Sequence, residues 1–365
     1  MGKLIKVFGA ALDATDIPLS IQMKQNYLNQ LAQDLVPIPN FLDPYEGLLQ
    51  LSRLLINDKF VKIGKFPIES WLTPKPNPED SHLMKQVEFQ KFTKKGSIET
   101  ISRNLDDYVR NKILPDFPLM IGVDHSLTGG VLSALSNKFG PEDLIVLIFD
   151  AHFDGLPANI SLNIAKYMNE HPEEKNPLIP EYIDTIDGNL NISDNYTCAS
   201  FLFYLVNEKV IKPENLIIFG CQDYPDENFR SLDDSRILEF VQFYDDMEQK
   251  GVKFIPKSES LIMLKKLSSI LKEFEKTNMY LSFDTDVGAL KEIIATRFRN
   301  AIGIDHTTIL NAAKTIKNIN YSNKIDLIGL DIMEIETHLL NKSFPKSRRK
   351  DQTINVVDNF LDIIL

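Results

Sequence analysis

The chain has 365 residues, of which 43% are hydrophobic and 25% are charged, a composition typical of soluble globular proteins. Its formal net charge of −11 at pH 7 argues against nucleic-acid or anionic-membrane partners and favours cationic ligands. The chain shows no run of the roughly 20 apolar residues that a membrane helix needs and no secretory signal, and its two cysteines suit a reducing cytoplasm.

Short apolar runs along the chain have the length and the flanking residues of buried β-strands. Amphipathic segments lie between them, and this alternation predicts right-handed βαβ units with a parallel sheet that is covered on both faces. The expected strands are Leu4 to Phe8, Pro118 to Val123, Leu144 to Phe149, Leu216 to Gly220, Lys253 to Ile255, Met279 to Phe283 and Ile325 to Leu330. The expected helices include Pro44 to Asn57, Ser97 to Lys112, Ser200 to Asn207 and Ser258 to Lys276.

Two segments, 67–80 and 159–195, are interpreted as surface excursions from this core. The first is rich in proline and contains Trp71, and the second carries several Asn and Asp residues. A loop as long as the second one inside a compact domain is usually either functional or mobile. Neither segment has the composition of an interdomain linker, so a single domain that spans residues 1–365 is predicted.

The most informative motif is Asp150-Ala-His152-Phe-Asp154, which directly follows the apolar run Leu144 to Phe149. The carboxyl ends of parallel strands share one edge of the sheet, and ligands bind at that edge in open α/β folds. Three potential metal ligands at alternating positions therefore predict a metal site there. The structural alternative is a turn Asp, a capping Asp and an incidental His.

Other strand ends add ligands of the same types. His125 follows the expected strand Pro118 to Val123, and Asp284 and Asp286 follow Met279 to Phe283. Four unpaired carboxylates at one place would raise each other's pKa, whereas two divalent cations would neutralise them. Oxygen-rich ligation with some imidazole favours Mn²⁺ over Zn²⁺ or Cu²⁺. The candidate ligands are thus His125, Asp150, His152, Asp154, Asp284 and Asp286.

These motifs resemble the three signatures of the ureohydrolases, the family of arginase, agmatinase, formimidoylglutamase and guanidino-acid hydrolases. They are Gly122-Val-Asp124-His125-Ser126, Asp150-Ala-His152-Phe-Asp154 and Ser282-Phe-Asp284-Thr-Asp286, each placed after an apolar strand. The resemblance reaches to the Lys350-Asp-Gln-Thr353 segment and so covers nearly the whole chain. It implies a three-layer α/β/α fold with a mostly parallel sheet, and a homo-oligomer.

The resemblance also implies a cofactor of two Mn²⁺ ions per chain. The implied ligands are His125 and Asp154 for one ion, His152 and Asp286 for the other, and Asp150 and Asp284 as bridges. A metal-bridging hydroxide would then attack the central carbon of a linear guanidine or amidine and cleave a C–N bond.

Two acids have implied catalytic roles. Glu334, in Asp331-Ile-Met-Glu334, is similar to the family's acid that anchors the guanidinium or amidinium group of the substrate. Its structural alternative is an acid at a helix start, beside the helix dipole. Asp154 would pass the released proton to the leaving amine.

The substrate loops depart from the family pattern. Cys198 stands in the stretch that in the family usually contains a proton-transfer histidine. The alternative interpretation of Cys198 is a small buried residue at a helix start, without a role in catalysis. Asp223 fits one position of the loop that binds a substrate amino group, but Pro225 falls where a second Asp is often found. Arg297 and Arg299 would receive a carboxylate or another anionic tail, or would be solvated loop arginines.

Three functions remain open from the sequence. The leading one is a dinuclear manganese hydrolase that acts on a small guanidino or amidino substrate. A catalytically silent member would keep the metals for folding or for partner binding. A single-zinc deacetylase on the related fold would use fewer acids. Two Mn²⁺ per chain would favour the first and one Zn²⁺ the last, while the altered loops leave the substrate open.

Overall fold

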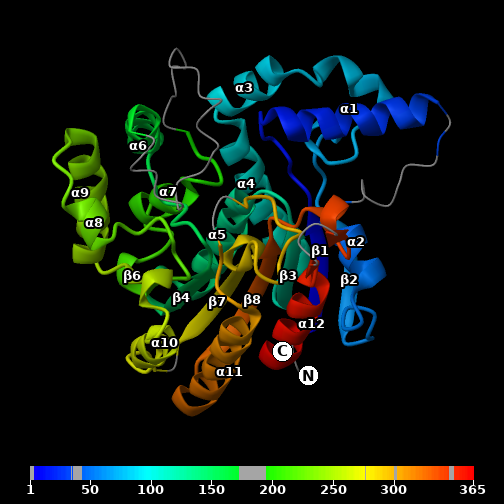
Figure 1. Cartoon of the computed structure of the whole chain (residues 1–365). Coiled ribbons are helices and arrows are strands. Elements are labelled where there is room, and N and C mark those ends of the chain that lie inside the picture. Colours follow the sequence, from blue (N-terminus) through cyan, green and yellow to red (C-terminus); the bar gives the residue numbers. More distant parts are fainter. Residues whose placement is uncertain are drawn as a thin grey trace.

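The computed structural model describes residues 4–33, 35, 43–171, 195–275, 277–299, 302–344 and 349–365. Within these residues, eight parallel strands form a sheet in the order β2-β1-β3-β8-β7-β4-β5-β6 (Figure 1). The strands are β1 (Ile5–Ala10), β2 (Phe60–Lys65), β3 (Phe117–Gly122), β4 (Leu144–Phe149), β5 (Leu216–Phe219), β6 (Lys253–Ile255), β7 (Asn278–Asp284) and β8 (Asp326–Met333). A separate antiparallel pair joins β9 (Ser343–Phe344) to β10 (Arg349–Lys350). The α/β fold with a parallel sheet, expected from the sequence, is confirmed.

Helices cover both faces of the sheet and make three layers (Figure 1). One face packs against α2 (Pro44–Leu51), α10 (Met263–Leu271), α11 (His306–Asn323) and α12 (Thr353–Ile364). The core on the other face takes in α1 (Pro18–Ala32), α3 (Gln86–Lys94), α4 (Ser97–Tyr108), α5 (Thr128–Phe139), α6 (Ala158–Glu170), α7 (Phe201–Asn207), α8 (Glu227–Arg230) and α9 (Ser235–Gln249).

Strand β4 shows why the sheet is buried on both faces. Its side chains alternate between the two cores, because successive residues of a strand point to opposite faces. Leu144, Val146 and Ile148 belong to the core that contains α4 and α5, whereas Leu147 and Phe149 belong to the core that contains α11 and α12. All six residues of the strand are buried, as a continuous apolar run predicts for a parallel strand.

Four of the described α-helices begin at an aspartate whose side chain caps the helix. The Asp43 side chain accepts the backbone N–H of Glu46, and Pro44 occupies the first turn of α2. Helix α11 begins in the same way, with Asp305 accepting the N–H of Thr308. These contacts satisfy N–H groups that have no partner within the helix. Among the described residues, no helix is long and apolar enough to cross a membrane.

Some elements differ from the sequence predictions. The edge strand β2 was missed because its burial is mixed and its apolar residues form no continuous run. Segment 159–195 was interpreted as a surface excursion, but its first part belongs to α6, in which Ile160 and Ile164 are buried. Residues 172–194 lie outside the described ones, so the interpretation of the whole segment as a surface excursion stays a prediction. In segment 67–80, the Trp71 ring packs 5.2 Å from the ring of Phe89.

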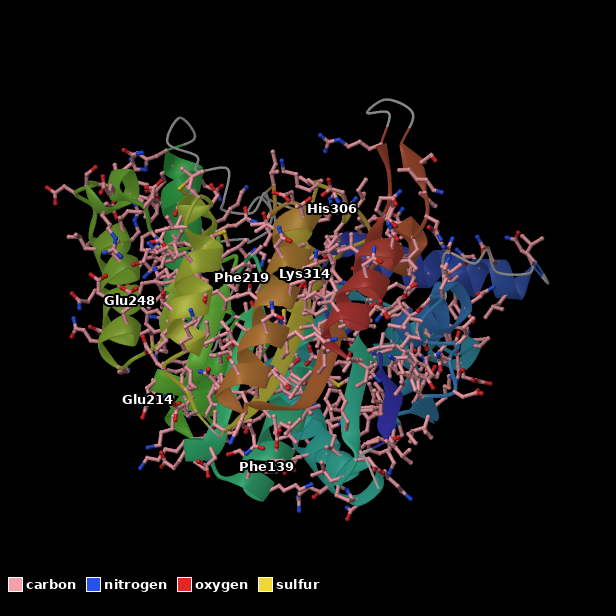
Figure 2. The ribbon with its side chains drawn as sticks, turned by 90° about the horizontal axis from the view of Figure 1, so that it is seen from below. Phe139, Glu214, Phe219, Glu248, His306 and Lys314 are labelled. Atoms are coloured by element: carbon pink, nitrogen blue, oxygen red, sulfur yellow. The ribbon has the colours of Figure 1, made fainter. Side chains whose placement is uncertain are left out.

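The carboxyl ends of the parallel strands lie along one edge of the sheet. Phe139 and Glu214, which lie just before β4 and β5, are at one end of the molecule in Figure 2, and His306, where α11 begins, is at the other end. Strands β3, β8, β7 and β4 are consecutive in the sheet. The four strand ends that carry polar motifs therefore lie side by side.

Candidate metal centre

The carboxyl edge of the sheet gathers buried His, Asp and Glu side chains. The described residues contain three groups in which one ligand atom per residue lies within 4.8 Å of the others: His125, Asp150 and Asp284; Asp150, His152 and Asp286; Asp284, Asp286 and Glu334. Asp150 is shared by the first two groups, and Asp284 by the first and the third. The groups therefore form one continuous cluster that contains five of the six predicted ligands and Glu334.

His125 is the centre of one half of the cluster. Its Nδ1 atom lies 2.8 Å from Oδ2 of Asp154, 3.1 Å from Oδ2 of Asp150 and 3.2 Å from Oδ2 of Asp284. Asp154, the sixth predicted ligand, therefore joins the cluster through His125. One imidazole nitrogen and three carboxylate oxygens facing one another are a donor set for a divalent cation.

His152 is the centre of the other half. Its Nδ1 atom lies 2.8 Å from Oδ2 of Asp286 and 3.6 Å from Oδ1 of Asp150. Asp150 thus turns one carboxylate oxygen toward each imidazole, because its other oxygen, Oδ2, lies near His125. This is the geometry of a carboxylate that bridges two sites.

The spacing of the acids follows from the local backbone. Oδ1 of Asp150 accepts the N–H of His152, and Oδ1 of Asp284 accepts the N–H of Asp286. Each Asp therefore closes a turn with the residue two positions on. Oδ1 of Asp286 accepts the N–H of Ala151, at 3.0 Å. The turns hold one oxygen of each carboxylate and leave the other directed into the cluster.

Two site residues have backbones in the left-handed region, Asp154 at φ 55° and Glu334 at φ 61°. This conformation costs a non-glycine residue about 1–3 kcal/mol and is often found at functional sites. Neighbouring hydrogen bonds hold both residues: the carbonyl of Asp154 accepts the N–H of Leu202, and the carbonyl of Glu334 accepts the N–H of Arg297. The backbone is thus constrained where the side chains enter the cluster.

Burial and mutual repulsion strongly perturb the acids of the cluster. Burial and the carboxylate of Asp150 raise the pKa of Asp154 to about 7. Burial and the charges of Asp284 and Asp286 raise the pKa of Glu334 well above its ordinary value. Burial lowers the pKa of His125, but the nearby carboxylates of Asp150, Asp154 and Asp284 outweigh that effect and raise it well above the ordinary value. Protons therefore neutralise this cluster when no cation does.

The donor set fits two divalent cations. Oε2 of Glu334 is buried and has no hydrogen-bond partner within the described part of the chain. Oδ2 of Asp150 and Oδ2 of Asp286 also accept no hydrogen bond there, and each faces an imidazole nitrogen, of His125 at 3.1 Å and of His152 at 2.8 Å. An unpaired buried acceptor is costly unless a cation or a ligand satisfies it. Two imidazoles with four aspartates suit an oxygen-preferring ion such as Mn²⁺, and one four-coordinate Zn²⁺ would leave acids unused.

A buried network that the sequence analysis missed supports His125. The hydroxyls of Thr128, Tyr280 and Ser282 donate to the carboxylate of Asp331 at 2.7, 2.6 and 2.6 Å. The Ser282 oxygen also lies 2.8 Å from Nε2 of His125. Because its one hydrogen points to Asp331, the oxygen accepts the Nε2–H of His125 and keeps Nδ1 toward the carboxylates. One feature of the sequence could have indicated this network. Ser282 lies two residues before Asp284 and Asp331 lies three residues before Glu334, on the adjacent strands β7 and β8.

The model of the arginase family matches residues 79–353. The chain belongs to the arginase family. This membership confirms the resemblance found in the three sequence motifs.

Individual arginase-family proteins are similar over shorter or more divergent stretches. The arginase of Staphylococcus aureus strain COL is 26% identical over 215 residues, which are 59% of this chain and 60% of the relative. The match to the arginase of strain MRSA252 covers 246 residues and 66% of each chain. The matched part of this chain thus spans less than two thirds of the length of these relatives.

Solved structures of the family have the same fold. Arginase from Bacillus caldovelox superposes with a TM-score of 0.56 at 15% identity, covering 99% of this chain and 98% of the other. Proclavaminate amidino hydrolase from Streptomyces clavuligerus superposes with a TM-score of 0.54 at 16% identity, and the match covers 100% of this chain and 90% of the other. A putative agmatinase from Clostridium difficile superposes with a TM-score of 0.53 at 16% identity, and the match covers 100% of this chain and 97% of the other.

Cys198 lies in the turn before α7, and its thiol holds its proton. The hydroxyl of Tyr196 donates to the carbonyl of Ser126 at 2.7 Å and ties this loop to the His125 segment. Burial and the carboxylates of Asp124 and Asp154 raise the pKa of the Cys198 thiol well above its ordinary value. The thiol is therefore protonated at neutral pH and does not act as a base.

The predicted substrate residue Asp223 has partners within the protein. Its Oδ2 accepts the N–H of Phe153 at 3.2 Å, and its Oδ1 accepts a hydrogen bond from Sγ of Cys221 at 2.9 Å. Burial raises the pKa of Asp223 above its ordinary value. These contacts hold the loop that carries His152 and Asp154, and contact of Asp223 with a substrate stays a prediction.

Arg297 is buried in the protein. Its side chain is 9% exposed, and Nη1 lies 2.6 Å from Oδ1 of Asp13. The interpretation of Arg297 as a solvated loop arginine is therefore wrong. The next residue, Phe298, places its ring 6.3 Å from the ring of His152, so this loop forms part of the wall of the metal centre.

Proposed function

We propose that the protein is a dinuclear metal hydrolase, most simply a manganese enzyme, that cleaves a C–N bond of a linear guanidine or amidine. The observation that carries this proposal is the continuous cluster in which Asp150 links His125 to His152 and Glu334 adjoins Asp284 and Asp286. Membership of the arginase family supports it. In this proposal the six predicted ligands hold two ions.

Glu334 is proposed to anchor the cationic group of the substrate. Its Oε2 atom is buried and has no hydrogen-bond partner among the described residues. A planar guanidinium or amidinium donates two parallel N–H groups, which match the two oxygens of a carboxylate. The raised pKa of Glu334 would fall when a cation binds, so substrate and carboxylate stabilise each other's charged forms.

When bound, the two ions supply a water of lowered pKa that is nucleophilic near neutral pH. Glu334 orients the planar central carbon of the substrate toward the cluster. Asp154 would accept the proton that the attacking water releases and give it to the leaving nitrogen. Addition of water across the broken C–N bond yields urea and an amine from a guanidine, or formamide and an amine from a formimidoyl group.

The altered loop favours a second candidate, a family member without catalytic activity. Cys198 holds its proton, so the thiol does not replace an imidazole in proton transfer. In this candidate the metals would serve folding or partner binding. Retention of Glu334 beside the metal-site acids favours the enzyme. Homo-oligomer formation and a cytoplasmic location stay predictions.

The test is a manganese-loaded activity screen combined with metal counting. The panel contains arginine, agmatine, formimidoylglutamate, guanidinobutyrate and arginine-containing peptides, and the assay detects urea, formamide and ammonia. We expect two Mn²⁺ per chain and turnover of one substrate class. No turnover with two ions bound would favour the silent member, and a single Zn²⁺ would favour a deacetylase. In Asp154→Asn, turnover that survives with both ions in place would contradict the proton-transfer role of Asp154.

A further inference from the structure

Glu334, the proposed anchor of the substrate, is held through its backbone by segment 295–297. The N–H of Arg297 donates to the carbonyl of Glu334 at 2.8 Å, and the N–H of Glu336 donates to the carbonyl of Ala295 at 3.1 Å. These two bonds flank an isolated antiparallel β-bridge. The backbone of Glu334 lies in the left-handed region, at φ 61°, which a non-glycine residue keeps only when its surroundings hold it there. The direction of the Glu334 side chain therefore depends on where segment 295–297 lies.

The side chain of Arg297 ties segment 295–297 to a distant part of the chain. Nη1 of Arg297 donates to Oδ1 of Asp13 at 2.6 Å, and both side chains are buried. Asp13 lies in the loop that follows β1, where its own N–H donates to the carbonyl of Leu72 at 2.6 Å. One buried ion pair therefore joins the segment that supports Glu334 to the loop after β1.

Lys24, in α1, holds Asp13 from the other side. Its Nζ lies 3.5 Å from Oδ2 of Asp13 and donates to the carbonyls of Asp13 and Trp71 at 2.5 and 3.3 Å. These three contacts match the three N–H groups of an ammonium. Burial lowers the pKa of Lys24 to about 8, so the side chain stays charged at neutral pH. The carboxylate of Asp13 is thus fixed between two cations, and the place of Arg297 follows from it.

A second carboxylate balances the charges of this network. Oε2 of Glu336 lies 3.8 Å from Nε of Arg297, and Oε1 of Glu336 lies 2.8 Å from Nδ1 of His338. Two cations, Lys24 and Arg297, thus face two carboxylates, Asp13 and Glu336. A buried ion pair is weak evidence for stability, because removing charges from water is costly. The planar fork of a guanidinium, however, fixes the direction of the groups that it joins, so the network specifies position.

We propose that Arg297 is a positioning residue for Glu334: its ion pair with Asp13 fixes segment 295–297 and thereby keeps the Glu334 carboxylate turned into the metal centre. The inference rests on the proposed function, since it takes Glu334 as the anchor of the cationic group of the substrate. Arg297 acts through the backbone of Glu334 and does not touch the substrate. This role differs from the one expected from the sequence, which was contact with an anionic tail of the substrate.

The first test is a double-mutant cycle on kcat/KM, with the guanidine or amidine that the activity screen shows to be cleaved. Arg297→Met leaves Asp13 paired with Lys24, so the variant should fold and keep two Mn²⁺, while kcat/KM falls about 10-fold or more. In the Glu334→Gln background the same change should alter kcat/KM by less than about 2-fold, because the group that Arg297 positions is already absent. Arg236→Met, which breaks an arginine–aspartate pair at the start of α9, is the control and should leave kcat/KM unchanged.

Two further variants keep the test valid if Arg297→Met does not fold. Arg297→Lys retains a cation beside Asp13 and should recover most of the kcat/KM that Arg297→Met loses. Lys24→Met weakens the same ion pair from α1 and should give a smaller loss, which again disappears in the Glu334→Gln background. An equal loss with and without the Glu334 carboxylate would overturn the proposal, and so would loss of the metal ions in Arg297→Met or an equal loss in Arg236→Met.

Backbone hydrogen exchange of the manganese-loaded protein distinguishes failure of this inference from failure of the proposed function. The N–H groups at positions 297 and 336 donate across the backbone pair, and their exchange is measurable even if no guanidine or amidine is cleaved. In Arg297→Met their exchange should accelerate about 10-fold or more, while the amides of β4 keep their rates. Unchanged exchange at the pair would overturn the positioning role, as would an equal acceleration in β4, which indicates general destabilisation.

Discussion

The strand ends and the loops beside them use their buried acids differently. At the strand ends, Asp150, Asp286 and Glu334 each keep a buried carboxylate oxygen without a hydrogen-bond partner among the described residues. In the loop after β5, Asp223 engages both oxygens, with Phe153 and Cys221. Buried polar groups in native proteins are nearly always paired. The comparison therefore separates acids that are available to a cation or a substrate from Asp223, which stabilises the loop through its hydrogen bonds.

The largest expected effect is on the shared acid. Asp150→Asn removes the carboxylate that links the two imidazoles, so the protein should bind fewer than two ions and lose activity by more than about 100-fold, the upper range for loss of a supporting residue alone. Asp223→Asn is the matched control: it should keep both ions and lose about 1–3 kcal/mol of stability. Metal analysis and denaturant unfolding measure both. Equal metal loss in the two variants would remove the distinction between strand ends and loops.

Glu334→Gln should separate substrate binding from metal binding. The amide cannot neutralise a cationic substrate, and loss of one partner of a buried charge pair costs about 2–5 kcal/mol. We expect kcat/KM to fall by about 100-fold or more at the low end of that range, while two ions remain bound. Since the variant also removes a buried acid, the metal-free protein should be no less stable than the wild type. Loss of both ions would instead place Glu334 among the essential ligands.

The metal-free protein should lose stability as pH rises from about 4 to about 7. The pKa of Asp154 is raised from 3.8 to about 7, and the pKa values of Asp284 and Glu334 are raised as well. A carboxyl group with a raised folded-state pKa binds its proton more tightly when folded, so its contribution is present at low pH and disappears as pH passes the folded pKa. The total loss of folding stability over this pH range is on the order of a few kcal/mol.

Manganese should reverse this pH dependence, because the ion replaces the protons and binds the ionised carboxylates more tightly as pH rises. Melting temperatures measured across this pH range, with chelator and with Mn²⁺, test the prediction. Parallel curves under the two conditions would show that the strand-end acids do not hold the ion.

The smallest expected effect is in the network beneath His125. Ser282→Ala removes the oxygen that accepts Nε2–H, at 2.8 Å, and leaves Asp331 with one hydroxyl donor fewer. We expect the fold to be retained and the metal affinity to fall about 10- to 100-fold. Competition with a chelator measures this affinity. Thr128→Val removes another donor to Asp331 without touching His125, so its effect on metal affinity should be smaller.

Local patterns determined much of the fold. Strands β4 and β6 have the predicted bounds, because continuous apolar runs are buried on both faces of a parallel sheet. The edge strand β2 and helix α6 were not recognised from their residues. Their mixed burial depends on which face the rest of the protein covers.

The sequence by itself determined which side chains would share the carboxyl edge, since strand ends with polar motifs must meet there once the sheet is parallel. Only the tertiary structure decided which of those side chains keep an unused atom. Asp223 and Arg297 are both polar residues in substrate loops, yet one has both oxygens engaged and the other keeps Nε unpaired. That difference depends on partners such as Cys221, two residues away, and Asp13, from the first strand end, whose distances are set by packing and not by spacing along the chain.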